Sequence, residues 1–139
     1  MARRYLYSTL AATLVVAATS CTTGSKLEKY VKESNASLAG RELAPGFYCD
    51  GMAIDADTVV ITYSFPDVSA TPDELNSLAP IRDYYKDLFL RGLVNDKINH
   101  PDGIKIITDA EVYMKGVFKF QNLTIDVIAT PDEILKALQ

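Results

Sequence analysis

Apolar and polar residues alternate along several stretches of the chain, and a period of two is typical of strands with one buried face. The pattern is clearest over 58–65 and 111–120. The side chains expected to share the buried face are Val59, Ile61, Tyr63 and Phe65 in the first stretch and Val112, Met114, Gly116, Phe118 and Phe120 in the second. A Gln121-Asn122 turn and a further alternating stretch over 123–129 complete a predicted hairpin.

A second hairpin is predicted earlier in the chain. Its first strand covers about 47–54, and Asp55-Ala56-Asp57 supplies the turn into 58–65. Asp is favoured in turns because its side chain hydrogen-bonds the local backbone. The two hairpins together provide four strands.

Helix starts are marked by a hydroxyl residue followed three positions later by Glu, the pattern of a capping box. The three examples are Ser25 with Glu28, Thr71 with Glu74, and Thr130 with Glu133. Pro72 and Pro131 strengthen the last two, because Pro suits the first helical position. We expect helices over about 26–38, 72–78 and 131–138, with Gly40 ending the first.

Two further helical segments follow from the positions of Pro80 and Pro101. Pro80 cannot donate to the preceding turn, so the middle helix should break there and continue over about 80–93. Pro101-Asp102 favours a short helix through Asp109. The run 104–107 is also compatible with a strand, so 102–109 stays open between helix and strand.

The resulting element order is α-β-β-α-(α)-β-β-α, which predicts one α+β domain. Two tight hairpins favour a four-stranded antiparallel sheet with helices packed on one face. The other face would carry Val60, Tyr113, Val117 and Ile128 among Thr, Lys and Asp side chains. A mixed apolar and polar surface is typical of interfaces, so this face is a candidate interaction surface unless the first or last helix packs on it.

The first residues of the chain have the organisation of an export signal. Arg3-Arg4 precede an apolar run over about 6–18, and Ala18-Thr19-Ser20 lead to Cys21. This segment resembles the lipobox of bacterial lipoproteins, although Ala18 stands where a branched aliphatic residue is usual. The resemblance implies that the signal is cut before Cys21 and that the cysteine carries acyl chains such as palmitate. An ordinary secretory signal cleaved near Ala18 and an uncleaved N-terminal anchor are the alternatives.

The lipobox resemblance also implies a domain organisation and a cellular location. Residues 1–20 would be the signal peptide, 21–25 the lipidated cysteine with a short tether, and 26–139 the folded domain. Two or three acyl chains hold a protein stably on a membrane. With no acidic sorting signal after Cys21, we expect a lipid-anchored envelope protein, facing the periplasm from the outer membrane in a Gram-negative host. Architecture and anchor together resemble small uncharacterised lipoproteins of Bacteroidota.

The net charge of the mature chain limits the classes of partner that we expect. Removing 1–20 takes two arginines from a chain with 14 basic and 18 acidic residues, so the mature formal charge becomes −6. An acidic surface repels phosphate backbones, so we expect no nucleic-acid partner. The expected partners are the membrane, through the acyl chains, and an envelope protein.

No recognisable catalytic or metal motif follows the anchor. Once Cys21 is lipidated, Cys49 has no intrachain disulfide partner, and its strand position favours a buried, inert thiol. His100 is the only histidine, and it lacks the neighbouring ligands that a zinc site needs. We therefore expect no catalytic residue, metal or cofactor.

The leading functional hypothesis is a non-enzymatic, lipid-anchored envelope protein of binding or accessory type. A periplasmic inhibitor or immunity-type protein is the alternative within binding. A hydrolase that uses Cys49 or a carboxylate pair is the alternative from another class.

Overall fold

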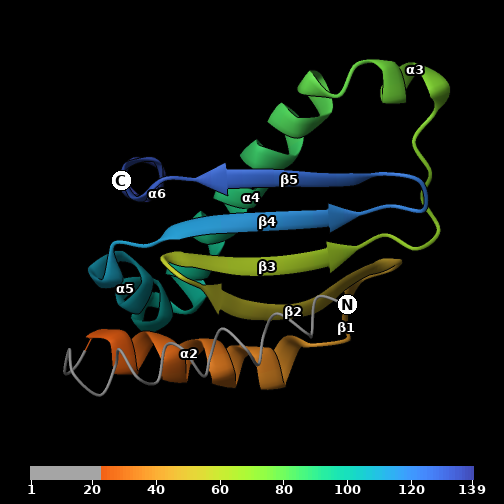
Figure 1. Cartoon of the computed structure of the whole chain (residues 1–139). Coiled ribbons are helices and arrows are strands. Elements are labelled where there is room, and N and C mark those ends of the chain that lie inside the picture. Colours follow the sequence, from red (N-terminus) through yellow and green to blue (C-terminus); the bar gives the residue numbers. More distant parts are fainter. Residues whose placement is uncertain (1–22) are drawn as a thin grey trace.

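The computed structural model describes residues 23–139, so Cys21 and the expected signal peptide lie outside the described part. The elements follow one another as α2 (Thr23–Leu38), β1 (Arg41–Ala44), β2 (Phe47–Asp55), β3 (Thr58–Ser64), α3 (Pro72–Asn76), α4 (Ala79–Asn99), α5 (Pro101–Ala110), β4 (Tyr113–Lys119), β5 (Thr124–Ala129) and α6 (Pro131–Ala137). Figure 1 shows the sheet face-on with α4 crossing behind β4 and β5. The α+β class is confirmed.

The sheet differs from the predicted four-stranded antiparallel one. It has five strands in the order β1-β2-β3-β4-β5. Both predicted hairpins form, β2 with β3 and β4 with β5, but β3 and β4 are parallel, with Thr58 opposite Tyr113 and Ser64 opposite Lys119. The connection through α3, α4 and α5 is long enough to return the chain in the same direction, and parallel neighbours need such a crossover.

The extra strand, β1, was not predicted because it carries no pattern. All four of its residues are exposed, so no alternation marks it. Gly40 (φ +79°) and Gly46 (φ +75°) stand on either side of it in left-handed conformations that suit glycine. Gly40 ends α2 as expected, and Gly46 lies in the turn that pairs β1 with β2.

The helices differ from the prediction mainly at their ends. α2 begins at Thr23, so residues 23–25 of the expected tether are helical and Ser25 lies in the first turn rather than before it. Pro80 does separate two helices, α3 and α4. α4 continues to Asn99, past the expected end near residue 93. The open segment is a helix, α5, over Pro101–Ala110.

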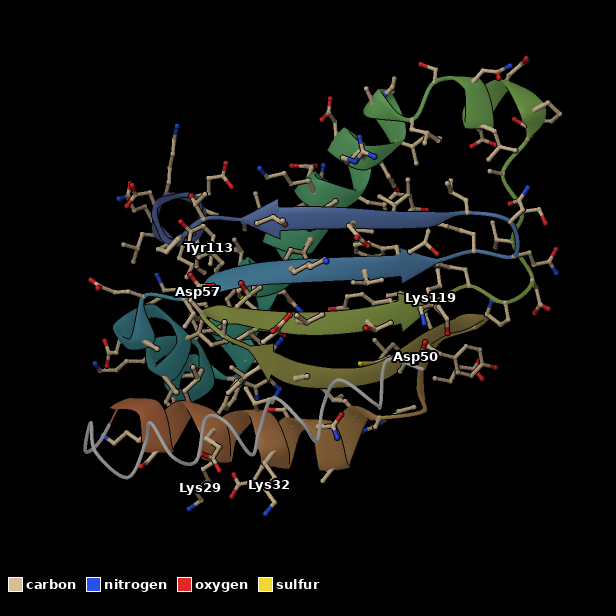
Figure 2. All side chains as sticks on the ribbon, in the orientation of Figure 1. Lys29, Lys32, Asp50, Asp57, Tyr113 and Lys119 are labelled. Carbon is tan, nitrogen blue, oxygen red and sulfur yellow. The ribbon has the colours of Figure 1, made fainter. Side chains whose placement is uncertain are left out.

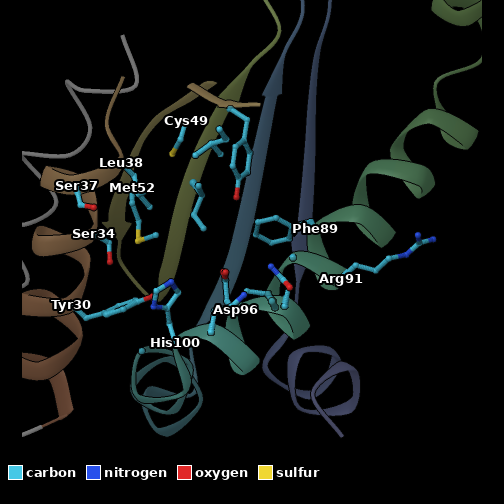
Figure 3. A pocket seen from close by; sticks show the side chains of 18 of the residues that line it. Tyr30, Ser34, Ser37, Leu38, Cys49, Met52, Phe89, Arg91, Asp96 and His100 are labelled. Atoms are coloured by element: carbon cyan, nitrogen blue, oxygen red, sulfur yellow. The ribbon is translucent and has the colours of Figure 1, made fainter. Parts of the chain in front are cut away.

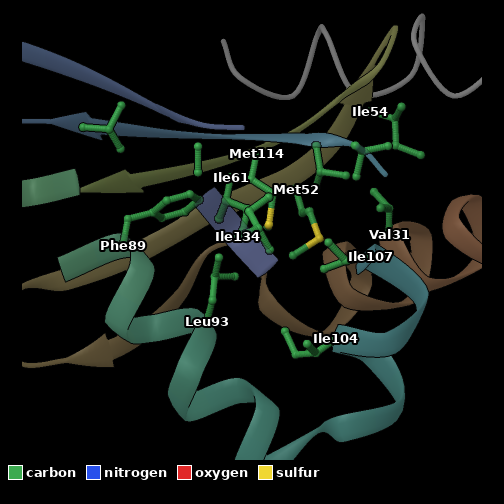
Figure 4. Close-up of a cluster of buried hydrophobic side chains, with 14 of the residues drawn as sticks. Val31, Met52, Ile54, Ile61, Phe89, Leu93, Ile104, Ile107, Met114 and Ile134 are labelled. Carbon is green, nitrogen blue, oxygen red and sulfur yellow. The ribbon is translucent and has the colours of Figure 1, made fainter. Parts of the chain in front are cut away.

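One hydrophobic core lies between the sheet and its helices (Figure 4). α2 contributes Leu27 and Val31, and α4 contributes Phe89 and Leu93. The other members of the core are Cys49, Met52, Ile54, Val59, Ile61, Ile104, Ile107, Val112, Met114, Phe118, Ile125, Val127, Ala129, Ile134 and Leu138. The predicted inward faces of both hairpins are confirmed, and the helices that bury them lie on one face of the sheet.

The opposite face of the sheet carries the four residues predicted as an interaction surface. Tyr113 is 38% exposed and Ile128 is 51% exposed, while Val60 and Val117 are partly exposed. Figure 2 shows Tyr113 and Lys119 on this side of the molecule. We call Val60, Tyr113, Val117 and Ile128 the open sheet face, since the core helices α2, α4, α5 and α6 pack on the other side.

Candidate functional site

A cavity of about 960 Å³ opens between α2 and α4, above the core side of the sheet (Figure 3). We call it the α2–α4 cleft. Its floor is formed by side chains of β2, β3 and β4: Phe47, Cys49, Met52, Ile61, Tyr63 and Phe118. Cavities that bind small molecules have volumes of about 300–1,000 Å³ and a largely apolar lining with a few polar groups, so this cleft has a suitable size and lining.

α5 packs against both helices, but α2 rests on β2 whereas α4 rests mainly on β5, so the two helices lie over different parts of the sheet. On α2, the Asn35 side chain accepts a hydrogen bond of 2.9 Å from the backbone N–H of Met52. Met52 lies on β2, past the last residue of that strand that pairs with β1. α4 packs instead over β5 and α6. Phe89 on α4 meets Phe118 edge-on, with ring centroids 6.4 Å apart. The space between the helices is therefore left to the cleft.

Stacked aromatic rings form one side of the floor. Tyr63 lies between Phe47 and Phe118, with ring centroids 5.4 Å and 5.1 Å away. Phe47 also stacks on Phe65 at 4.7 Å, beyond the cleft lining. Such stacked rings cover one another's faces, so they are held rigidly and leave apolar edges for contact with a bound molecule.

Polar residues from several elements line the cleft, and two of them, Cys49 and Asp96, lie within electrostatic range of a third, Tyr63. Burial raises the pKa of Tyr63, and the potential negative charges of Cys49 and Asp96 raise this pKa further, which places the three groups within electrostatic range. Burial also raises the pKa of Asp96, although His100 opposes the effect. Asp96 is accessible to solvent, yet it is surrounded by enough protein to be partly desolvated.

Cys49 has the properties of a buried thiol rather than of a nucleophile. It is 1% exposed. Burial raises its pKa, and a backbone hydrogen bond at Gly51 only partly opposes that rise. His100 lines the same cleft, but Figure 3 shows the two side chains at different ends of it. Thiol reactivity needs the thiolate, so this environment disfavours nucleophilic chemistry at Cys49.

The paired acidic residues of the sequence lie in the first turns of helices, where they stabilise the helix N-terminus. Thr71 with Glu74 and Thr130 with Glu133 form the two predicted capping boxes, each with both hydrogen bonds present. The acids Asp73 and Asp132 lie in the first turns of the same helices, where negative charge is favoured. Over residues 23–139, no group of three or more His, Cys, Asp and Glu side chains could hold a metal ion.

The sequence reasoning did not find the cleft. Asp96 follows Phe89 and Leu93 at positions i+7 and i+3, so it lies on the same side of α4 as these two buried residues, although it is itself exposed. A carboxylate on an apolar helical stripe is a signal of a polar site. That signal was missed because the helix was expected to end near residue 93. Sequence spacing gives no sign that α2 and α4 stand apart.

Comparisons with known proteins support the fold. A crystal structure at 1.60 Å of a Pseudomonas aeruginosa protein described as a "putative secreted protein" is similar to this chain, with a TM-score of 0.51 and 12% sequence identity. The similarity covers 76% of this chain and 88% of that one. No family model and no curated protein matches the chain. Within residues 23–139, no helix is both long and apolar enough to cross a membrane.

Proposed function

We propose that the chain is an exported, lipid-anchored accessory protein of the cell envelope that works by binding another envelope component in the α2–α4 cleft. The observation that carries this proposal is the cleft itself, with about 960 Å³ of space above a rigid aromatic floor. The anchor rests on Cys21 and the signal before it. The fold shared with a protein described as secreted is compatible with export.

Gly92 offers a direct test of binding in the cleft. It lies on α4 and lines the cleft, and a Cβ atom at this position would have no atom within 4 Å. Gly92→Phe therefore places a ring at the cleft without a clash near the backbone, and Gly92→Ala is the matched control. Native mass spectrometry of protein purified from envelopes should show a bound small molecule in the wild type and in Gly92→Ala, but not in Gly92→Phe. Absence of any bound species in the wild type would contradict binding in the cleft.

The proposed lipid anchoring can be tested independently of the cleft. Metabolic labelling with a fatty-acid analogue should mark the wild-type protein and leave Cys21→Ala unlabelled. Labelling of both proteins, or of neither, would contradict lipidation at Cys21.

A second candidate function uses the open sheet face for a protein partner, including an inhibitor or immunity-type role. It is favoured by the exposure of Ile128 and Tyr113. Ile128→Lys should abolish stoichiometric co-purification of one partner from detergent-solubilised envelopes. Leu135→Lys, which replaces a similarly exposed apolar residue on α6, should leave the complex intact. Equal behaviour of the two variants would contradict this candidate.

A further inference from the structure

The Asp96 carboxylate has no described counter-ion. Figure 3 shows its side chain directed into the cleft from α4. Within residues 23–139, neither an ion pair nor a hydrogen bond to this carboxylate is present, and the basic group that acts on its pKa is His100, one turn further along. Solvent still reaches the Asp96 side chain, so its negative charge stays available to a cation that enters the cleft.

The other charged groups around the cleft do not pair with Asp96. Arg91 lines the cleft but forms an ion pair with Asp87 on the preceding turn of α4. Glu33 on α2 also lines the cleft, and Lys29 lies 3.9 Å from its carboxylate. Lys97, outside the cleft lining, donates to the backbone carbonyl of Leu138. Asp102, at the start of α5, also lines the cleft and adds negative charge. A cation in the cleft would accordingly meet Asp96 without displacing an existing partner.

The aromatic side chains of the cleft floor would contact the apolar part of a bound ligand. Tyr63 and Phe118 lie in the floor, stacked with ring centroids 5.1 Å apart, and Tyr30 closes the side formed by α2. Tyr63 is stacked on both sides, so the ring edges rather than the faces are left to bury the apolar part of a bound molecule. The positive charge of such a molecule would therefore be met by Asp96 and not by the rings.

We propose that the α2–α4 cleft binds small amphipathic amines, with the protonated amine on Asp96 and the apolar body against the ring edges of Tyr63 and Phe118. This inference rests on the proposed binding function and names its ligand class. Anionic molecules are disfavoured because Asp96 and Asp102 repel them. Neutral apolar molecules keep the aromatic contacts but leave Asp96 unpaired.

Three probes with one naphthyl body test the charge preference: 2-naphthylethylamine, 2-naphthylethanol and 2-naphthylacetate. Titration calorimetry on the full chain should give the tightest binding for the amine, about tenfold tighter than for the alcohol, since a charge-assisted hydrogen bond is about twice as strong as a neutral one. The acetate should bind most weakly. Asp96→Asn should reduce the affinity for the amine to that for the alcohol and leave the alcohol unchanged.

Matched variants distinguish a wrong ligand class from a wrong binding site. Asp83→Asn removes the same charge from an exposed position of α4 away from the cleft, and it should leave amine binding unchanged. Gly92→Phe should weaken all probes, because it fills the cleft. Equal affinities for amine and alcohol, with both lost in Gly92→Phe, would overturn the amine preference but keep the proposed function. Binding of the probes that is insensitive to Gly92→Phe would overturn both.

Discussion

Gly103 on α5 and Tyr30 on α2 approach so closely that a Cβ atom on Gly103 would lie 2.5 Å from Cε1 of the tyrosine ring. Real Cβ atoms do not come that close to another atom, so any side chain at position 103 would have to displace the Tyr30 ring. Tyr30 also lines the cleft. The position therefore links the packing of α2 on α5 to the shape of the candidate site.

Gly103→Ala should lower the free energy of unfolding by about 1–3 kcal/mol, because overpacking forces Tyr30 to move. Urea denaturation measures the change. Gly92→Ala is the control, since it is also helical but meets no atom within 4 Å. There the loss of glycine should stabilise the protein by about 0.5–1 kcal/mol. Similar effects of the two substitutions would contradict the packing argument.

The two capping boxes should differ in their contribution to stability. Thr130→Ala removes the cap of α6, which buries Ile134 and covers the end of the core, and should cost about 1–2 kcal/mol. Thr71→Ala removes the same hydrogen bond from α3, a helix of five residues that buries none of them. Its loss can be absorbed by local fraying, so its effect on the urea midpoint should be clearly smaller. A larger effect at Thr71 would contradict this interpretation.

Glu133 should make stability depend on acid pH. A hydrogen bond from Lys86 at 3.0 Å, together with the backbone hydrogen bond at Thr130, lowers the pKa of Glu133 below 4.5. A lowered pKa means that the group stabilises the folded state above its unfolded pKa and that this contribution is lost as the pH falls through the folded pKa. The pair is partly exposed, so the effect should be at most about 1 kcal/mol.

The variant that isolates this ion pair is Glu133→Gln. Glutamine still fits a capping box but cannot pair with Lys86 as a charge. Urea unfolding between about pH 6 and pH 3 should show a smaller loss of stability in Glu133→Gln than in the wild type. Lys86→Met should reduce the loss in the same direction. An unchanged pH dependence in both variants would contradict the assignment.

Cys49 should react slowly with alkylating reagents. The thiol is 1% exposed, and burial raises its pKa, so little accessible thiolate forms at neutral pH. In a Cys21→Ala background, where Cys49 is the remaining thiol, iodoacetamide should modify the protein only after unfolding in urea. Rapid alkylation of the folded protein would instead support the hydrolase alternative.

The two hairpins and the starts of α3 and α6 were readable from the sequence because they depend on neighbouring residues, whereas the start expected at Ser25 was wrong. Alternation around Val59 and Met114 fixes which face of each strand is buried. Thr71 and Thr130 place helix starts through contacts only three residues long. The exposed strand β1 and the far end of α4 escaped prediction, since neither carries the periodic apolar signal that marks the other elements.

The sequence by itself determined the α+β class, the inward faces of the hairpins, the capped helices and the candidate lipid-anchor residue Cys21. Only the tertiary structure decided that β3 and β4 run parallel and that Asp96 lies near Tyr63 in one cleft. Strand direction and the spacing of α2 from α4 depend on contacts between residues far apart in the chain. Local periodicity carries no information about such contacts, because each segment satisfies its own pattern in either arrangement.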